Sequence, residues 1–214
     1  MAKSLVFDLE TLDHKPSAII LDISAVLVDL GDKDITFKSL LAGPVFNVKL
    51  DARTQVGRTV GKDTLKWWES QPVEVKKVLL PSKNDVHITA ALESFKQWLA
   101  DNDFDFKNDL AYCRGTSFDF AIMSDVCDKV CNTWDMGYSM FPCSFWNQRD
   151  TRTAVAHAMA FPTLKKLPVP VGTFDGFIKH NSVHDVCKDA MMLMLSHQYS
   201  LGNIDVPLER FDLI

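Results

Sequence analysis

The sequence lacks the patterns that mark membrane proteins and secreted proteins. No apolar run reaches about 18 residues, the length at which a segment becomes a candidate membrane-spanning helix. The start of the chain, MAKSLVFDLE, has neither the basic region nor the long apolar core of a signal peptide. We therefore expect a cytoplasmic protein with no membrane partner.

Cysteine pairs and a broad basic surface are also missing. The five cysteines form no CxxC motif, and an odd number in a reducing compartment favours buried thiols over a disulfide framework. A net charge of -5 excludes a broad basic surface, so any contact with nucleic acid must be local or carried by bound cations. No internal repeat or low-complexity linker divides the 214 residues. We expect one domain over residues 1–214, large enough for a substantial core.

The hydrophobic pattern predicts both strands and helices. Apolar and β-branched residues predict antiparallel strands at 4–10 and 17–30, and residues 35–40 should extend this meander. Further along the chain we expect a buried strand at 109–115, a loop at 167–177, two short helices within 63–81, and longer helices at 84–102, 117–131, 151–161 and 184–199. Asn84 or Asp85 is the expected cap of the helix at 84–102. Antiparallel strands followed by helices alternating with strand predict an α/β layered fold.

Two acids lie on one face of the first strand. Asp8 and Glu10 are two residues apart, so Phe7 and Leu9 belong to the opposite, apolar face. Adjacent carboxylates repel each other and resist desolvation, so the simplest interpretation is a strand that ends in solvent. A third acid, Asp119, falls in the first turn of a helix that follows a buried strand. It either carries function or only complements the helix dipole.

The segment HNSVHDVCKD, residues 180–189, is rich in histidine and aspartate. Asp189 directly precedes the apolar run AMMLML, a position that is costly for an acid unless it is paired or bound to metal. Asp185 lies one helical turn earlier and competes for the same role. His180 is interpreted as part of a loop or helix start. A zinc protease helix would need glutamate right after the first histidine, and Asn181 stands there instead.

Three of these elements occur in an order typical of one superfamily. FDLET, RGTSFD and HDVCKD resemble, in turn, the D-x-E-T, F-D and H-x-x-x-x-D motifs of the DEDDh exonucleases. WWESQ, CRGTSFDF, FWNQRDTRT and HNSVHDVCKDA are similar to the DexA-type exonucleases of T-even bacteriophages, and the RNase AS type of exoribonuclease shares much of this pattern. The resemblance implies an RNase H-like (DnaQ-like exonuclease) fold, with a central mixed sheet flanked by helices.

The resemblance also implies a set of site residues. It assigns metal binding to four acids, which are Asp8, Glu10, Asp119 and Asp189. His184 becomes the general base, which reaches the site from the helix start because it lies roughly 140° from Asp189 around a helix. Leu9 and Thr11 are assigned to the 3′ end of the substrate, with Leu9 as a wedge against the last base.

Phosphodiester hydrolysis explains why carboxylates are the residue type required. Two divalent ions can serve both the attacking and the leaving oxygen, and Mg²⁺ or Mn²⁺ prefers oxygen ligands. Four carboxylates would be balanced by two such ions. The ions would also let a chain of net charge -5 hold a phosphate backbone.

Arginines and tryptophans provide secondary candidates for substrate binding. Arg149 and Arg152 could grip a phosphate, or could pair with Asp150 to fix a loop or build the interface of a homodimer. Trp67 and Trp68 could stack on bases, but packing is the favoured interpretation for a short helix.

We therefore expect a metal-dependent 3′-5′ exonuclease that releases 5′-mononucleotides from single-stranded DNA, in the host cytoplasm if the chain is encoded by a phage. The alternatives are a 3′-5′ exoribonuclease of the RNase AS type and a catalytically degenerate module that only binds nucleic acid. The degenerate module is disfavoured because every position assigned to catalysis carries the required residue type.

Overall fold

The protein is described by a computed structural model that covers residues 3–130, 142–209 and 211–214. Its strands are β1 (Ser4–Thr11), β2 (Ile20–Val28), β3 (Phe46–Lys49), β4 (Leu110–Cys113), β5 (Gln148–Asp150), β6 (Pro168–Pro170) and β7 (Phe211–Leu213). Its α-helices are α1 (Phe37–Ala42), α2 (Lys62–Glu69), α3 (Val73–Lys76), α4 (Ile88–Asp101), α5 (Asp119–Val130), α6 (Thr151–Ala158) and α7 (Ser182–Ser200). Short 3-10 turns η1 (Ala52–Thr54), η2 (Lys77–Leu79) and η3 (Phe145–Asn147) complete the described elements.

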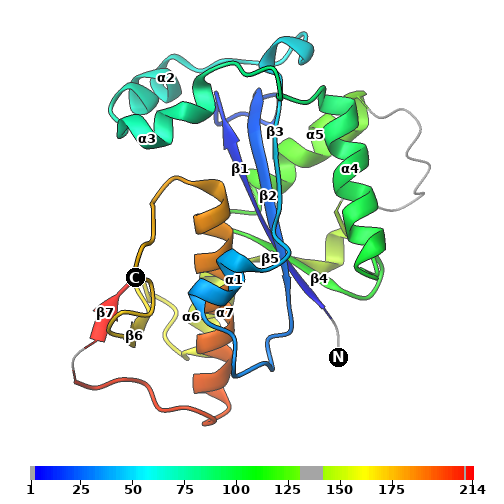
Figure 1. Ribbon diagram of the computed structural model, residues 1–214. Coiled ribbons are helices and arrows are strands. Elements are labelled where there is room, and N and C mark those ends of the chain that lie inside the picture. The colour runs from blue at the N-terminus through cyan, green and yellow to red at the C-terminus, as the bar shows by residue number, and fades with distance from the viewer. Residues whose placement is uncertain (1–2, 131–141, 210) are drawn as a thin grey trace.

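A mixed sheet forms the centre of the molecule, in the strand order β3-β2-β1-β4-β5. β1 pairs antiparallel with β2 and parallel with β4, and β5 continues the parallel half. The expected antiparallel pairing of the first two strands is confirmed. β6 and β7 form a separate pair near the C-terminus (Figure 1).

Helices cover both faces of the sheet, and β1 contributes to both cores. Leu5 and Phe7 face α4 and α5, while Val6 faces α1, α6 and α7. Figure 1 shows α4 and α5 on one side of the strands and α6 and α7 on the other. The polar end of β1 continues the Val6 face, because side chains alternate along a strand. Asp8 and Glu10 therefore lie on the face that carries α7.

Several predicted segments differ in the structure. Residues 35–40 do not form a strand: α1 begins after Thr36, whose side chain and that of Ser39 make a reciprocal capping box. Neither predicted cap of α4 is used, because its N-cap is His87, whose Nδ1 accepts a hydrogen bond from the Thr89 N–H. The predicted loop at 167–177 contains β6.

The last helix, α7, begins earlier than the sequence suggested. Its N-cap is Asn181, whose side chain accepts a hydrogen bond from the His184 N–H. The helix packs against β1, β2, α1 and α6. Its N-terminal end lies against β2, because the Ser182 side chain bonds to Asp22 and Ser24 (Figure 1). The start of α7 within HNSVHDVCKD is therefore held on the face of β1 and β2.

The cysteines and the helices of the described part of the chain bear on the expectations of buried thiols and of no membrane span. Cys113, Cys127, Cys143 and Cys187 are buried, and Cys131 lies outside the described residues. Within the ranges that the structure covers, we find no helix that is both long and apolar enough to cross a membrane.

Candidate active site

Three carboxylates meet at the end of β1. Oxygen atoms of Asp8, Glu10 and Asp185 lie within 4.8 Å of one another. The β1–β2 register places Asp8 opposite Ser24 and Glu10 opposite Asp22, so a fourth acid faces the same side of the sheet. Asp185 enters from the first turn of α7. The arrangement concentrates negative charge where β1, β2 and α7 meet.

Asp119 approaches the same cluster from the first position of α5. Its side chain is buried, and its Oδ1 has no hydrogen-bond partner among the described residues. Desolvation is the main cause that raises the pKa of Asp119 to about 7, while hydrogen bonds from the Leu9 backbone and the Cys113 thiol oppose the shift. A buried carboxylate oxygen without a donor is the kind of atom that a cation can satisfy.

The cluster opposes its own ionisation in the absence of a cation. Burial raises the pKa of Asp8, and the charges of Asp119, Glu10 and Asp185 raise it further. Burial likewise raises the pKa of Glu10, followed by the charges of Asp185 and Asp22. Hard divalent ions bind oxygen ligands and remove this repulsion, so the residues present fit a divalent metal site.

Asp189, which the sequence analysis assigned to the metal, makes a different set of contacts. Both of its oxygens accept hydrogen bonds from the Arg114 guanidinium, at 2.7–3.0 Å. Its charge still contributes to the raised pKa values of Asp8 and Asp119, so it lies near the site. Its carboxylate is neutralised by arginine, and Asp185 stands where the sequence analysis expected Asp189.

The two histidines of the segment face different surroundings. The ring of His180 lies 4.8 Å from the ring of Trp67, and its backbone N–H donates to Asp185 at 2.8 Å. His180 also has a positive φ of 63°, which turns the chain sharply just before α7. Burial lowers the pKa of its imidazole, and the charge of Asp185 raises it. His180 therefore stands beside the acid cluster, and its burial favours the neutral form of the ring.

His184 lies among aromatic side chains away from the cluster. Its ring is 6.0 Å from that of Phe37 and 6.4 Å from that of Phe177. Its Nδ1 accepts a hydrogen bond from the Ile178 N–H, which occupies one of the two ring nitrogens. The role of general base that the sequence analysis gives to His184 stays a prediction, and it is His180 that lines the hollow beside Glu10.

The sequence contains a spacing that pairs His180 with Asp185. The spacing H-x-x-x-x-D occurs twice, as His180 to Asp185 and as His184 to Asp189. The sequence analysis assigns the motif to the second copy. Spacing alone could not choose, because the two copies are identical in it.

Leu9 and Thr11 make contacts that stabilise the fold. The Leu9 side chain is 4% exposed and packs in the core formed with α4 and α5, so it is not placed to act as a wedge. The Thr11 hydroxyl donates to the Asp13 carbonyl at 2.7 Å. The Thr11 carbonyl accepts from the buried Trp68 indole at 2.9 Å, which ties α2 to the end of β1. Trp68 therefore packs as expected, whereas Trp67 is 39% exposed beside His180.

The two arginines of FWNQRDTRT separate in the structure. The Arg149 guanidinium donates to the carbonyls of Trp146 and Gln148 within its own loop. Arg152 instead lines a surface hollow together with Arg114. No ion pair between either arginine and Asp150 occurs in the described residues, where Asp150 instead caps α6.

Asp22 is a buried acid that the sequence analysis did not identify. Its carboxylate accepts hydrogen bonds from the Ser182 hydroxyl, from the Asn47 amide at 2.8 Å and from the Ser24 hydroxyl at 3.3 Å. Burial still raises its pKa. Because Ser182 is the first residue of α7, this network holds the helix start against β2. The antiparallel register of β1 and β2 places Asp22 opposite Glu10, so this register would have identified Asp22.

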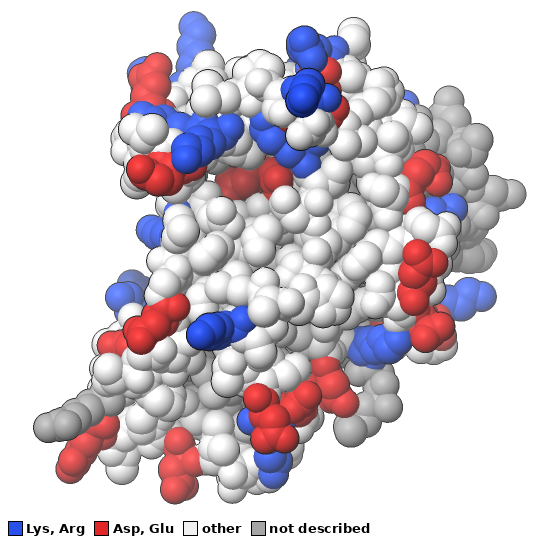
Figure 2. Space-filling model, in the orientation of Figure 1, with Lys and Arg blue, Asp and Glu red and all other residues white. Residues whose placement is uncertain are grey.

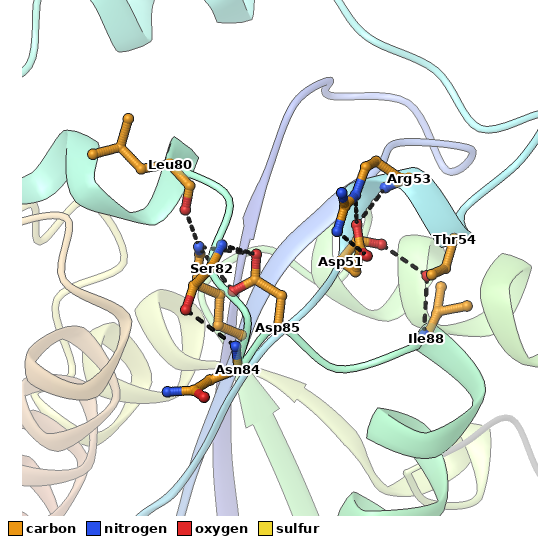
Figure 3. A network of polar contacts seen from close by, with 9 residues as sticks. Asp51, Arg53, Thr54, Leu80, Ser82, Asn84, Asp85 and Ile88 are labelled. Carbon is orange, nitrogen blue, oxygen red and sulfur yellow. Dashed lines mark hydrogen bonds and ion pairs between the residues drawn. The ribbon is translucent and has the colours of Figure 1, made fainter.

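A hollow of about 350 Å³ opens beside Glu10 and Asp22, with His180 on its wall. In Figure 2, acidic side chains are recessed beside the region of α2 and α3, whose outer surface carries both basic and acidic side chains. Lys49 also lines this hollow, but its ammonium is paired with Asp85 at 3.0 Å and bonds to the Leu80 carbonyl. Figure 3 shows this network, in which Asp85 also accepts from the Ser82 N–H at 2.8 Å.

Comparisons with known proteins show the family of this chain. The family model of the 3′-5′ exoribonuclease Rv2179c-like domain matches residues 3–195. An exodeoxyribonuclease of Enterobacteria phage T4 is 32% identical over 213 residues, which cover 95% of this chain and 93% of the phage protein.

Two solved structures resemble this chain in fold alone. Cell-death related nuclease 4 (CRN-4) matches with a TM-score of 0.58 and 15% identity, over 94% of this chain and 65% of that structure. The nuclease domain of 3′hExo, a DEDDh family member bound to rAMP, matches with a TM-score of 0.50 and 9% identity, over 100% of this chain and 96% of that domain. The expected RNase H-like fold is confirmed.

Proposed function

Because the chain belongs to the Rv2179c-like 3′-5′ exonuclease family and is a phosphodiester hydrolase, we propose that it acts on single-stranded DNA, releasing 5′-mononucleotides from the 3′ end. The preference for DNA is supported by the identity to the phage exodeoxyribonuclease over nearly the whole chain. RNA is the second candidate substrate, because the matching family model is described as an exoribonuclease domain.

The observation that carries the proposal is the meeting of Asp8, Glu10 and Asp185 within 4.8 Å, with the unsatisfied Asp119 beside them. We assign these four acids to two Mg²⁺ or Mn²⁺ ions. When bound, the ions stabilise the negative charge that develops on the attacking and leaving oxygens. Asp185 thus takes the role that the sequence analysis gave to Asp189.

His180 is assigned as the general base. A base must be neutral before reaction and within reach of the attacking water, and burial keeps the pKa of this imidazole below its usual value. His180 accepts a proton from the attacking water as the water oxygen bonds to phosphorus, and the bond from phosphorus to the 3′-oxygen of the penultimate nucleotide breaks. The 5′-mononucleotide is released, and the departing 3′-oxygen takes a proton from solvent to become the free 3′-hydroxyl of the shortened strand. The contact with Trp67 and the N–H bond to Asp185 hold His180 at the acid cluster.

The decisive experiment compares single-stranded DNA and RNA of equal sequence, each labelled at the 5′ end, in Mg²⁺ and in excess chelator. We expect a ladder that shortens from the 3′ end, faster for DNA, with complete loss of activity in chelator. A 3′-phosphate should block the reaction, because its extra negative charge would face the carboxylates that line the acidic hollow. Efficient cutting of a circular single strand would contradict an exonuclease, and full activity in chelator would contradict the metal assignment.

A further inference from the structure

A second hollow, of about 270 Å³, lies on the other side of the acid cluster. Its lining contains four cationic side chains, which are Arg114, Arg152, Lys165 and Lys166. The remaining lining is apolar, with residues such as Val155 on α6, and no carboxylate takes part in it. In a chain of net charge -5, such a concentration of positive charge needs a reason.

Most of the cationic side chains of this hollow form no ion pair with the described residues. Arg152 and Lys165 make no hydrogen bond or ion pair with any residue in the described ranges, and Lys166 makes one contact of 3.5 Å with the Leu213 carbonyl. Arg114 is the exception, since it binds Asp189 and, at 3.2 Å, the Met192 sulfur. Three cations are therefore free to bind an anion.

The hollow lies next to the catalytic acids. Arg114 directly follows β4, the parallel neighbour of β1, and its partner Asp189 is one helical turn beyond Asp185 on α7. The charges of Asp189, Asp185 and Asp8 all act on Arg114 and outweigh the effect of its burial, which on its own would lower the guanidinium pKa. The cationic hollow thus begins where the acid cluster ends, on the face that carries α7.

The two hollows differ in charge. Glu10, Asp22 and Glu74 line the hollow on the β2–β3 side, and Lys49 there is neutralised by Asp85, which leaves only Lys77 as an unpaired cation of its lining. The hollow on the β4–β5 side is cationic. A strand held at the metals also has two unlike ends: beyond the scissile phosphate, the 3′-terminal nucleoside has no phosphate, whereas the 5′ side has one at every nucleotide.

Building on the proposed function, we propose that the hollow of Arg114, Arg152, Lys165 and Lys166 binds the backbone phosphates on the 5′ side of the scissile bond, while the acid-lined hollow receives the 3′-terminal nucleoside. The cations would neutralise the backbone, and their release of counterions would make binding depend on salt. The charge difference would orient the strand with its 3′ end at the metals.

The test uses the variant Arg152→Gln/Lys165→Gln/Lys166→Gln. Its matched control is Lys33→Gln/Lys38→Gln/Lys107→Gln, which removes the same charge from exposed lysines outside both hollows. Each protein is assayed with the p-nitrophenyl ester of thymidine 5′-monophosphate, which has no phosphate beyond the scissile one, and with oligothymidylates of increasing length.

We expect the control to behave like the wild type. The hollow variant should keep its rate on the p-nitrophenyl ester but lose on the order of tenfold or more in kcat/KM on longer oligomers, mainly through KM. Its salt slope should fall by roughly 0.7 for each phosphate that is no longer neutralised. An equal loss on all substrates, or none on the oligomers, would overturn the proposal. Failure of the wild type itself to hydrolyse the ester or the oligomers would instead overturn the proposed function.

Discussion

Two copies of one spacing, four residues apart on the chain, have different surroundings in the fold. His180 and Asp185 face the acids of β1, whereas His184 packs on phenylalanine rings and Asp189 binds Arg114. The two copies have the same spacing but different contacts, so the contacts of the side chains, and not the spacing, distinguish the two copies. A helix that starts at Ser182 places Asp185 in its first turn, with His180 just outside it.

Replacing the acids of the two copies should have the largest effect. Asp185→Asn should lower kcat roughly 10³-fold or more, because a metal ligand supports several kcal/mol of transition-state stabilisation. Asp189→Asn should retain activity within about tenfold. It should instead lower the free energy of unfolding by about 2 kcal/mol, because Arg114 loses its charged partner.

Rates at saturating oligonucleotide and urea unfolding curves measure these effects. A folded but inactive Asp189→Asn, together with an active Asp185→Asn, would restore the second copy as the catalytic one.

Substitutions of the two histidines should also differ, with His180 affecting kcat and His184 affecting stability. The loss of kcat should be somewhat smaller than for Asp185→Asn. His180→Ala should reduce kcat about 10²- to 10³-fold with little change in KM, within the range for a positioned base. His184→Ala removes a ring that packs on Phe37 and should mainly lower stability. The pH profile provides the control: loss of its acid limb in His184→Ala, but not in His180→Ala, would contradict our assignment.

Metal-free stability provides a third comparison. Because the folded-state pKa values of Asp8, Glu10 and Asp119 are raised, the folded protein binds protons more tightly than the unfolded chain. The stability that the folded protein gains from this tighter proton binding is fully present below about pH 4. It is lost as the pH rises towards about 7, which is the pKa of Asp119.

In excess chelator, the Tm should therefore fall by a few degrees between pH 5 and pH 8. Asp185→Asn should flatten this slope, because it removes a charge that raises the pKa values of Asp8 and Glu10. A wild-type Tm that rises over this range without metal would show that the acids are not mutually repelling.

The smallest effect concerns the neighbours of the two histidines. Trp67→Ala should lower kcat about three- to tenfold, because a ring contact of this kind is worth about 0.5–1.5 kcal/mol. Trp67→Phe should recover much of the loss, and Phe177→Ala beside His184 should leave kcat unchanged. A loss in KM alone for Trp67→Ala would indicate that the tryptophan binds substrate instead of positioning His180.

Much of the fold could be predicted, because local periodicity carries it. The β1–β2 pair and the helices near 88–101 and 151–158 follow from alternation and from helical spacing. The strand predicted at 35–40 is wrong because Thr36 and Ser39 cap a helix there. The choice within HNSVHDVCKD depended on Arg114, which is 75 residues from Asp189 in the sequence, and no local pattern contains that contact.

The hydrogen bonds that tie Ser182 to Asp22 and Ser24 join residues about 160 positions apart in the chain. Asp8 and Glu10 of the acid cluster lie on β1, whereas Asp185 lies on α7. Contacts between such distant residues form late, since the loop between them must close first. The acid cluster is therefore completed late in folding, when α7 docks against β2.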